Sequence, residues 1–244
     1  GLENKFQPTA YSNAIISNAQ DIKMQAIRLR EEWKLGKDAI NNVQAMLETH
    51  FIKVIDVDAP EGFDGLSGMV NDKYPIIVLN SNIEQSERRR MTALHELGHL
   101  LFNTCFDPAL SSRQREGLCT VFANEMLIPS CVFSGIIGEN RKDISLNELT
   151  DLQILYGISI DAMMMKAKEL NIITEARCRT YYIKKNQDER FKRLVTASRF
   201  QEKKPKRFVS LVFRAIASDI ITTSKAASLL NISIEDVRNR LNLI

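Results

Sequence analysis

The sequence predicts an α+β protein in which a small antiparallel sheet packs on helices, with a mostly helical C-terminal extension. Three observations lead to this class. Helical spacing of apolar residues opens the chain, β-branched runs separated by turn residues follow, and helical spacing then returns. The expected helices before the sheet are 11–35 and 38–49, and the expected strands are 51–57, 66–70 and 74–79.

The composition is that of a globular protein. Of the 244 residues, 44% are hydrophobic and 26% are charged, and no apolar run approaches the ~18 residues that cross a membrane. The four cysteines lack CxxC spacing, which argues against a zinc ribbon and against a disulfide framework. We therefore expect a cytoplasmic protein with free thiols and no membrane contact.

The β region lies between the N-terminal helices and the rest of the chain. His50, directly after the second predicted helix, is expected to cap that helix or to lie on the surface. Strands 66–70 and 74–79 flank a short turn and suit an antiparallel hairpin. The second of them directly precedes the next helix. It either binds a substrate peptide along the sheet edge or is a purely structural edge strand, and the residues leave both open.

The helix predicted over residues 86–103 contains His95-Glu96-Leu97-Gly98-His99, an H-E-x-x-H sequence. Helical residues four apart lie on one face, about 6 Å apart at Cβ, so His95 and His99 can bind one tetrahedral zinc ion. Glu96 is rotated by about 100° and is placed to take a proton from a water at the metal. A core helix with two satisfied histidines is the other interpretation, but polar side chains on an apolar helix are costly without partners. Gly98 leaves room for another segment.

A catalytic zinc site needs a third protein ligand, and the next predicted helix, 112–128, offers Glu116 and Glu125. Nine residues separate the two acids, which places them half a turn out of phase, so only one can face the motif helix. Apolar or small residues accompany both faces. The spacing favours Glu116 only mildly, and Glu125 stays open as the alternative.

The motif, together with Glu116-Gly-Leu-Cys-Thr-Val-Phe-Ala-Asn-Glu-Met-Leu-Ile-Pro129, resembles the ImmA/IrrE family of bacterial zinc metallopeptidases. The likeness covers roughly residues 11–175 and includes Asp64-Gly-Leu-Ser-Gly68. In this family the second helix begins with the third zinc ligand, which falls on Glu116. The chain departs at Cys119, where the family often has Ala, and at Thr120, where it often has Asn. These changes alter the hydrogen bonding around the ligands.

The resemblance implies a zincin-like endopeptidase domain over residues 1–175, with Zn²⁺ held by His95, His99 and Glu116. The zinc ion would polarise the peptide carbonyl, and Glu96 would accept the proton of the water and return it to the leaving amine. The implied substrate is a protein, a helix-turn-helix transcriptional repressor cleaved in a stress or mobile-element response. Three residues stay open as the second stabiliser of the oxyanion: His50, Tyr74 and Tyr182.

Residues 176–244 are predicted to be a second region, a basic segment followed by helices. Residues 177–207 hold 12 Lys and Arg against 3 Asp and Glu, with aromatic residues interleaved. We interpret this segment as a solvated linker or as a docking segment, with at most weak, non-specific nucleic-acid contact. Residues 223–233 resemble the first helix and turn of a helix-turn-helix module, and 234–243 would form its second helix.

Two other functions fit the sequence. The first is a DNA- or partner-binding transcriptional regulator that keeps the zinc-site fold, which the basic segment and the C-terminal helices favour. The second is a toxin–antitoxin or assembly component held together by the metal. Glu96 favours the enzyme, because a protein that only binds has no need of a base at that position.

Overall fold

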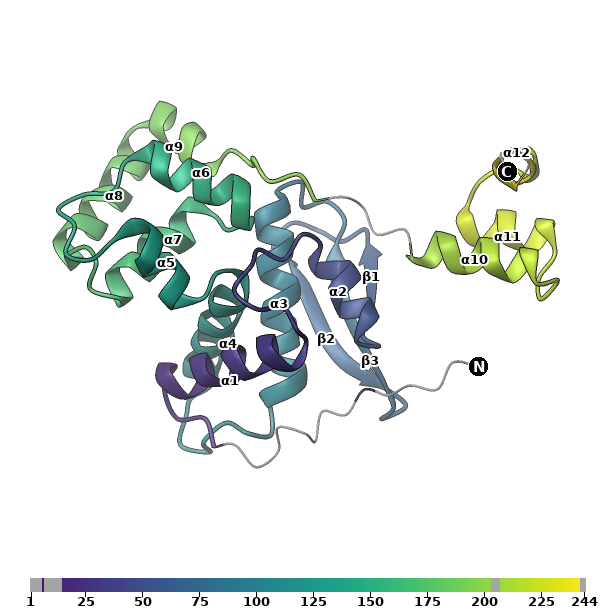
Figure 1. The fold of residues 1–244 in the computed structure, drawn as a ribbon, viewed down its shortest axis with the longest axis horizontal. Coiled ribbons are helices and arrows are strands. Elements are labelled where there is room, and N and C mark those ends of the chain that lie inside the picture. The colour runs from purple at the N-terminus through teal and green to yellow at the C-terminus, as the bar shows by residue number, and fades with distance from the viewer. Residues whose placement is uncertain (1–5, 7–14, 203–206, 242–244) are drawn as a thin grey trace. The chain divides into compact units, whose positions relative to one another are not determined.

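The computed structural model describes residues 6, 15–202 and 207–241 of the chain. By internal packing the chain divides into two units, 1–202 and 203–244 (Figure 1). The predicted α+β class is confirmed, because helices surround one small sheet. The functional division predicted after residue 175 stays a prediction, although the packing places residues 176–202 in the first unit. The predicted ends at residues 11 and 243 lie outside the described residues.

The sheet has three strands, in the order β1-β3-β2: β1 (Lys53–Val57), β2 (Gly65–Val70) and β3 (Tyr74–Asn80). β2 and β3 form the predicted antiparallel hairpin. β1 pairs with β3 in parallel, so the prediction of a purely antiparallel sheet is wrong. The reason is the connection 58–64, which carries the chain across the end of the sheet to β2, after which β3 returns between the two.

The position of β3 also shows that the prediction of an edge strand at residues 74–79 is wrong. β3 is the central strand and is paired along both edges, so it has no edge to offer a substrate peptide. The free edge nearest in sequence to the motif helix belongs to β2 instead. The inner face of the sheet carries Ile77 and Leu79, which are buried.

Helix α3 (Ser86–Phe102) lies against this inner face and forms the middle layer of the first unit (Figure 1). Its bounds match the predicted motif helix, with Asn103 as the C-cap. α4 (Ser112–Leu127) packs on the other side of α3, and α1 (Ala19–Glu32) packs on α4. α2 (Val43–Thr49) contacts both α3 and β1.

Both N-terminal helices begin later than predicted. Asn18 caps α1 through hydrogen bonds to the N–H groups of Gln20 and Asp21, and Asn42 caps α2 in the same manner. Residue Ile16, which was expected within the first helix, instead forms a β-bridge with Phe106. Apolar residues recur at helical spacing on the N-terminal side of both caps, so this spacing alone did not indicate where each helix begins.

Two buried charged residues anchor the first turns of α3. The Glu87 carboxylate accepts hydrogen bonds from the Ser198 hydroxyl and from the backbone N–H of Phe200, at 2.5 and 3.1 Å. Arg90 pairs with Glu202 at 2.8 Å and lies over the Phe200 ring at 4.2 Å. Burial opposes ionisation of Glu87, but these hydrogen bonds outweigh it and hold its pKa below the usual value. The segment 198–202 is therefore fixed to the helix that carries the motif.

The remaining helices of the first unit include residues 177–202 of the basic segment. Of its two interpretations, solvated linker and docking segment, their packing supports the second. Tyr181 and Val195 are buried in the core, and the Arg177 and Lys185 side chains pair with Asp143 and Asp161. Residues 177–202 of the segment therefore pack on the rest of the first unit, because apolar residues recur at helical spacing among the charged ones. The helices are α5 (Ser130–Ile137), α6 (Leu146–Tyr156), α7 (Ile160–Glu169), α8 (Glu175–Gln187) and α9 (Glu189–Thr196).

The second unit consists of α10 (Arg207–Ala217), α11 (Thr223–Leu230) and α12 (Ile234–Leu241). The two predicted C-terminal helices are confirmed as α11 and α12, with Asn231 in the left-handed conformation that ends α11. The unit has its own small core, formed by Val212, Ala226, Ala227 and Val237.

Among the described residues, no single helix is long and apolar enough to cross a membrane. α4 and α5 meet that criterion only when taken together, by length and composition, across a bend of 61°.

Candidate metal centre

The two motif histidines project from the same side of α3. Each is one turn from the other, and their rings meet edge to face with centroids 4.9 Å apart. The His95 side chain is 20% exposed and the His99 side chain is 23% exposed. Leu94 and Leu97, on the opposite side of the helix, are fully buried. The helix therefore places both imidazoles at a partly open surface and not in the core.

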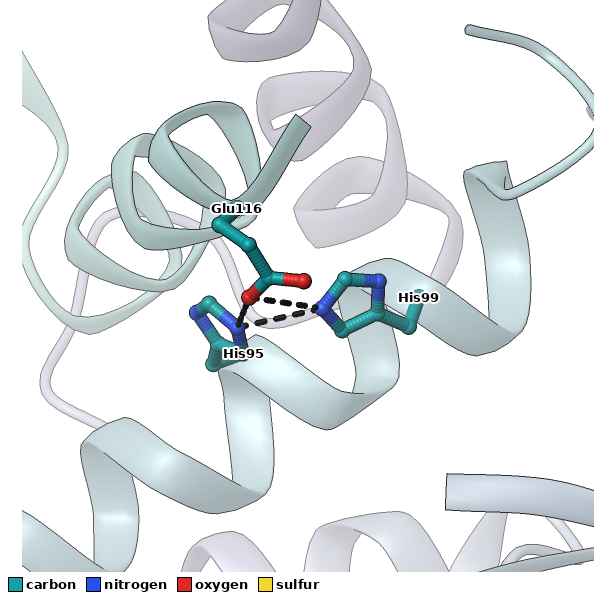
Figure 2. A group of neighbouring side chains, drawn as sticks. All are labelled: His95, His99 and Glu116. Carbon is teal, nitrogen blue, oxygen red and sulfur yellow. Dashed lines mark hydrogen bonds and ion pairs between the residues drawn. The ribbon is translucent and has the colours of Figure 1, made fainter. Parts of the chain in front are cut away.

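Glu116 completes a three-residue cluster from the neighbouring helix α4 (Figure 2). Its Oε2 atom lies 3.0 Å from Nε2 of His95 and 3.3 Å from Nε2 of His99. The two Nε2 atoms are 3.1 Å apart. Three ligand atoms from three side chains thus form a nearly equilateral triangle.

The close approach of α4 to α3 depends on Gly98. A Cβ atom at this position would lie 3.2 Å from the Phe122 ring and 3.3 Å from the Cys119 sulfur. A side chain there would therefore crowd Phe122 and Cys119, two buried residues of α4 that would have to shift to make room for it. Because the motif has glycine between its two histidines on the α4 side, Glu116 can reach both Nε2 atoms.

The triangle fits a tetrahedral zinc ion. Zinc binds His nitrogen and carboxylate oxygen at about 2.0–2.1 Å, and tetrahedral geometry then separates the ligand atoms by about 3.3 Å. The observed separations of 3.0 to 3.3 Å lie close to that value. Two neutral imidazoles with one carboxylate are also the donor set of catalytic zinc sites that leave a fourth position open.

The two histidines also affect the pKa of the Glu116 carboxyl. Partial burial raises the pKa of Glu116, but the hydrogen bonds and electrostatic interactions with His95 and His99 outweigh burial and bring the pKa below its usual value. The carboxylate is therefore ionised at neutral pH, which is the form that binds a metal ion.

The competing acid, Glu125, lies elsewhere. Its side chain is 2% exposed and is directed at α7, where Oε2 accepts from the Lys166 ammonium at 2.7 Å. The Ser130 hydroxyl donates to the same oxygen at 2.6 Å. Of the two acids that the sequence left open, Glu116 is the one that the fold brings to the histidines.

Residues 49–168 match the family model described as Peptidase_M78, IrrE N-terminal-like domain. These residues belong to the ImmA/IrrE family. Membership indicates a metallopeptidase-like function for the matched region. None of the curated proteins matches the chain.

A solved structure that is similar to this chain is a Mycobacterium tuberculosis transcriptional regulator. The similarity covers 65% of this chain and 48% of that one, with 16% sequence identity and a TM-score of 0.42. The chain therefore spans about half the length of that regulator.

The two departures of this ImmA/IrrE domain from the family pattern contact the outer nitrogens of the histidines. The Thr120 hydroxyl lies 3.3 Å from Nδ1 of His95 and donates to the Glu116 backbone oxygen at 3.1 Å. It can therefore accept from Nδ1–H, which leaves Nε2 of His95 free for a metal. The Cys119 sulfur is 3.6 Å from Nδ1 of His99. Burial, with smaller contributions from the nearby carboxylates, raises the pKa of this thiol to about 12, so it stays protonated at neutral pH.

A cleft of about 630 Å³ opens beside the ImmA/IrrE motif. His95 and Glu96 line it together with Gly65, at the start of β2, and Asp161 and Thr196 from the helices beyond.

None of the three open candidates for the oxyanion stabiliser is among the residues that line this cleft within the described part of the chain. His50 stacks on Trp33 at 3.9 Å. Tyr182 donates to the backbone of Asp161 at 3.2 Å, and Tyr74 lies below two lysine ammonium groups.

Sequence reasoning missed one contact in the site. The Ser67 hydroxyl of β2 donates to Oε2 of Glu96 at 2.7 Å. Ser67 lies within the segment Asp64–Gly68 that resembles the family, but no residue pattern indicated that it contacts the motif. Ser67 and Gly65 lie on the same face of the strand. If the packing of β2 on α3 had been predicted, this alternation would have placed Ser67 against the helix.

Proposed function

We propose that the chain is a zinc-dependent endopeptidase that hydrolyses a peptide bond in a protein substrate. One observation carries the proposal. The His95, His99 and Glu116 ligand atoms form a zinc-sized triangle, and Glu96 lines a cleft at the same point of α3. A structural metal site has no need of an ionisable side chain facing a cleft beside its ligands, whereas a hydrolytic site does.

Each of these residues has a separate role. The two Nε2 atoms and Oε2 of Glu116 would hold the zinc ion, which when bound supplies a Lewis acid for the peptide carbonyl and acidifies a water molecule. Glu96 takes the proton of the attacking water on its carboxylate and returns it to the leaving amine. Thr120 holds the ring of His95 in the tautomer that presents Nε2.

The shape of the site supports an extended segment of a protein as substrate. A cleft of about 630 Å³ holds a few residues of peptide and is too small for a folded domain. The edge of β2 lies at one side of it and can pair with an extended backbone. Following the family resemblance, the substrate is a helix-turn-helix repressor, cut in the cytoplasm at an exposed segment during a stress or mobile-element response.

Cleavage of a repressor by matched variants tests the proposal. The zinc-loaded protein is incubated with the repressor encoded nearest to its gene, and the products are read by mass spectrometry. Glu96→Gln should keep the zinc but slow cleavage by about 10² or more, because it removes the base. Glu61→Gln, in the exposed loop before β2, serves as the control and should cleave like the parent. Equal cleavage by Glu96→Gln and the parent would refute the mechanism.

A second function, transcriptional regulation through DNA or a partner, is favoured by the separate C-terminal unit. This unit has its own core and a helical pair, α11 and α12, joined by a short turn. A regulator of this kind depends on the second unit and not on Glu96. Reporter expression in cells separates the two functions: Glu96→Gln abolishes the response of a peptidase and leaves that of a regulator intact.

A further inference from the structure

Asp64 and the first residues of strand β2 contact three successive turns of helix α3. The Asp64 carboxylate binds Arg88 through two hydrogen bonds, of 2.9 and 2.6 Å. One turn later, a Cβ atom on Gly65 would lie 2.8 Å from Thr92, so the strand backbone rests directly on the helix there. After one more turn, the Ser67 hydroxyl reaches Glu96.

This contact follows from matched spacings. Two residues of a strand advance about 6.8 Å along the chain, and four residues of a helix advance about 6 Å. Because Gly65 lies against Thr92, the next inward strand residue, Ser67, arrives beside the next turn, at Glu96. The hydrogen bond of 2.7 Å is therefore a product of the way the sheet packs on the motif helix.

We infer that Ser67 is a positioning residue for the Glu96 carboxylate in peptide hydrolysis, an inference that rests on the function proposed above. A glutamate side chain has three rotatable bonds, and a general base must lie within hydrogen-bond reach of the proton that it takes. With Oε2 held by the Ser67 hydroxyl, Oε1 is the oxygen left to receive the proton. A hydrogen bond from a hydroxyl to a carboxylate is charge-assisted, so it holds the side chain in one orientation more firmly than a hydrogen bond between neutral groups would.

The same hydrogen bond joins the base to the substrate-binding strand. Ser67 lies in β2, an edge strand of the sheet whose first residue, Gly65, lines the cleft. A peptide that pairs with β2 is thereby placed in register with a carboxylate fixed from the same strand. Ser67 itself does not contact the metal ligands, so its removal should leave the metal site intact.

Four variants test the inference against the zinc-loaded parent: Ser67→Ala, Ser67→Thr, Glu96→Gln and Ser81→Ala. Ser67→Thr keeps the hydroxyl and suits a strand, and Ser81→Ala removes an exposed hydroxyl beyond β3. Zinc content is measured for each. The kinetic constants kcat and KM are measured on a quenched-fluorescent peptide, chosen from a randomised pool by its cleavage with the parent. Binding of acetohydroxamic acid, a zinc chelator whose hydroxyl can donate to Glu96, is measured by calorimetry and needs no turnover.

We expect Ser67→Ala to keep one zinc per chain and to lower kcat about 10-fold to 100-fold with a smaller change in KM, as for other residues that orient catalytic groups. Acetohydroxamic acid should bind it about 10-fold more weakly. Ser67→Thr should restore both values, and Ser81→Ala should match the parent. Glu96→Gln should lose more activity than Ser67→Ala, because it lacks the base itself.

Three results overturn the inference. If Ser67→Ala keeps kcat and hydroxamate affinity within about twofold while Glu96→Gln is inactive, the proposed function stands and the positioning role is wrong. If Ser67→Ala loses zinc, the serine is structural. If Glu96→Gln cleaves like the parent, the proposed function fails and the role of Ser67 fails with it. Should the parent cleave none of the peptides, the hydroxamate affinities of Ser67→Ala and Ser67→Thr decide alone.

Discussion

Replacing each of the two α4 acids by glutamine should affect different properties of the protein. Glu116→Gln removes the anionic donor from the histidine triangle. Changing only a hydrogen-bond partner of a metal ligand lowers metal affinity by up to about 100-fold, so loss of the carboxylate itself should lower zinc affinity by at least that much. The Glu116 side chain is 55% exposed, so the stability of the metal-free protein should change by less than about 0.5 kcal/mol.

Glu125→Gln should show the opposite pattern. It leaves the Lys166 ammonium buried, with 2% of that side chain exposed, opposite a neutral amide. Breaking one partner of a buried ion pair costs about 3–5 kcal/mol. The lower end applies, because the amide oxygen can still accept from the Ser130 backbone, now bonded at 2.7 Å. Burial also lowers the pKa of Lys166, so deprotonation of this lysine limits the loss.

A loss of about 3 kcal/mol corresponds to a decrease in Tm of about 6–12 °C for a unit of this size. Zinc affinity is measured by competition with a chromophoric chelator, and Tm by calorimetry of the metal-free proteins. If Glu125→Gln weakens zinc binding as much as Glu116→Gln does, the third ligand is misassigned. If it leaves Tm unchanged, the account of the buried pair is wrong.

Three further predictions concern parts of the fold outside the metal centre. Gly157→Ala should destabilise the first unit by more than about 1 kcal/mol in urea unfolding, because Gly157 has φ +61° and a Cβ there would lie 2.5 Å from Nε of Arg90. Burial lowers the pKa of His50 below its ordinary value of 6.5. The stability gained from keeping it neutral is present above pH 6.5 and is lost as the pH falls, so His50→Gln should flatten the change in the urea midpoint between about pH 7.5 and 5.5. The full chain should bind DNA duplexes only weakly and without sequence preference, with affinity falling steeply from low to physiological salt; sub-micromolar selective binding at physiological salt would contradict this.

Local sequence predicted the parts of the site that depend on a single element. The bounds of α3 and the hairpin of β2 and β3 followed from caps, turns and apolar spacing. The shared face of His95 and His99 followed from helix geometry alone. The choice of Glu116 over Glu125 rested only weakly on spacing and more on family resemblance, because both faces of α4 are apolar enough to pack.

The parts that the sequence did not predict depend on contacts between distant elements. The parallel pairing of β1 with β3 is set by where β2 lies, which no run of residues encodes locally. The basic segment resembled a linker because its many lysines and arginines obscured the helical spacing of its apolar residues. Two of these apolar residues, Tyr181 and Val195, are buried in the core. The contact between Ser67 and Glu96 requires the register of a strand on a helix.

The H-E-x-x-H sequence is therefore only part of what makes this site. Successive turns of α3 contact different neighbours. Arg90 holds the segment that ends at Glu202, and Thr92 contacts the strand that brings Ser67 to Glu96. Two glycines, Gly65 and Gly98, allow the strand and α4 to approach from opposite sides. A larger residue at Gly98 would disturb the distances between Glu116 and the two histidines, and a larger residue at Gly65 would disturb the contact between Ser67 and Glu96. The glycines thus contribute to the chemistry through geometry, even though neither has a side chain that can bind metal or move a proton.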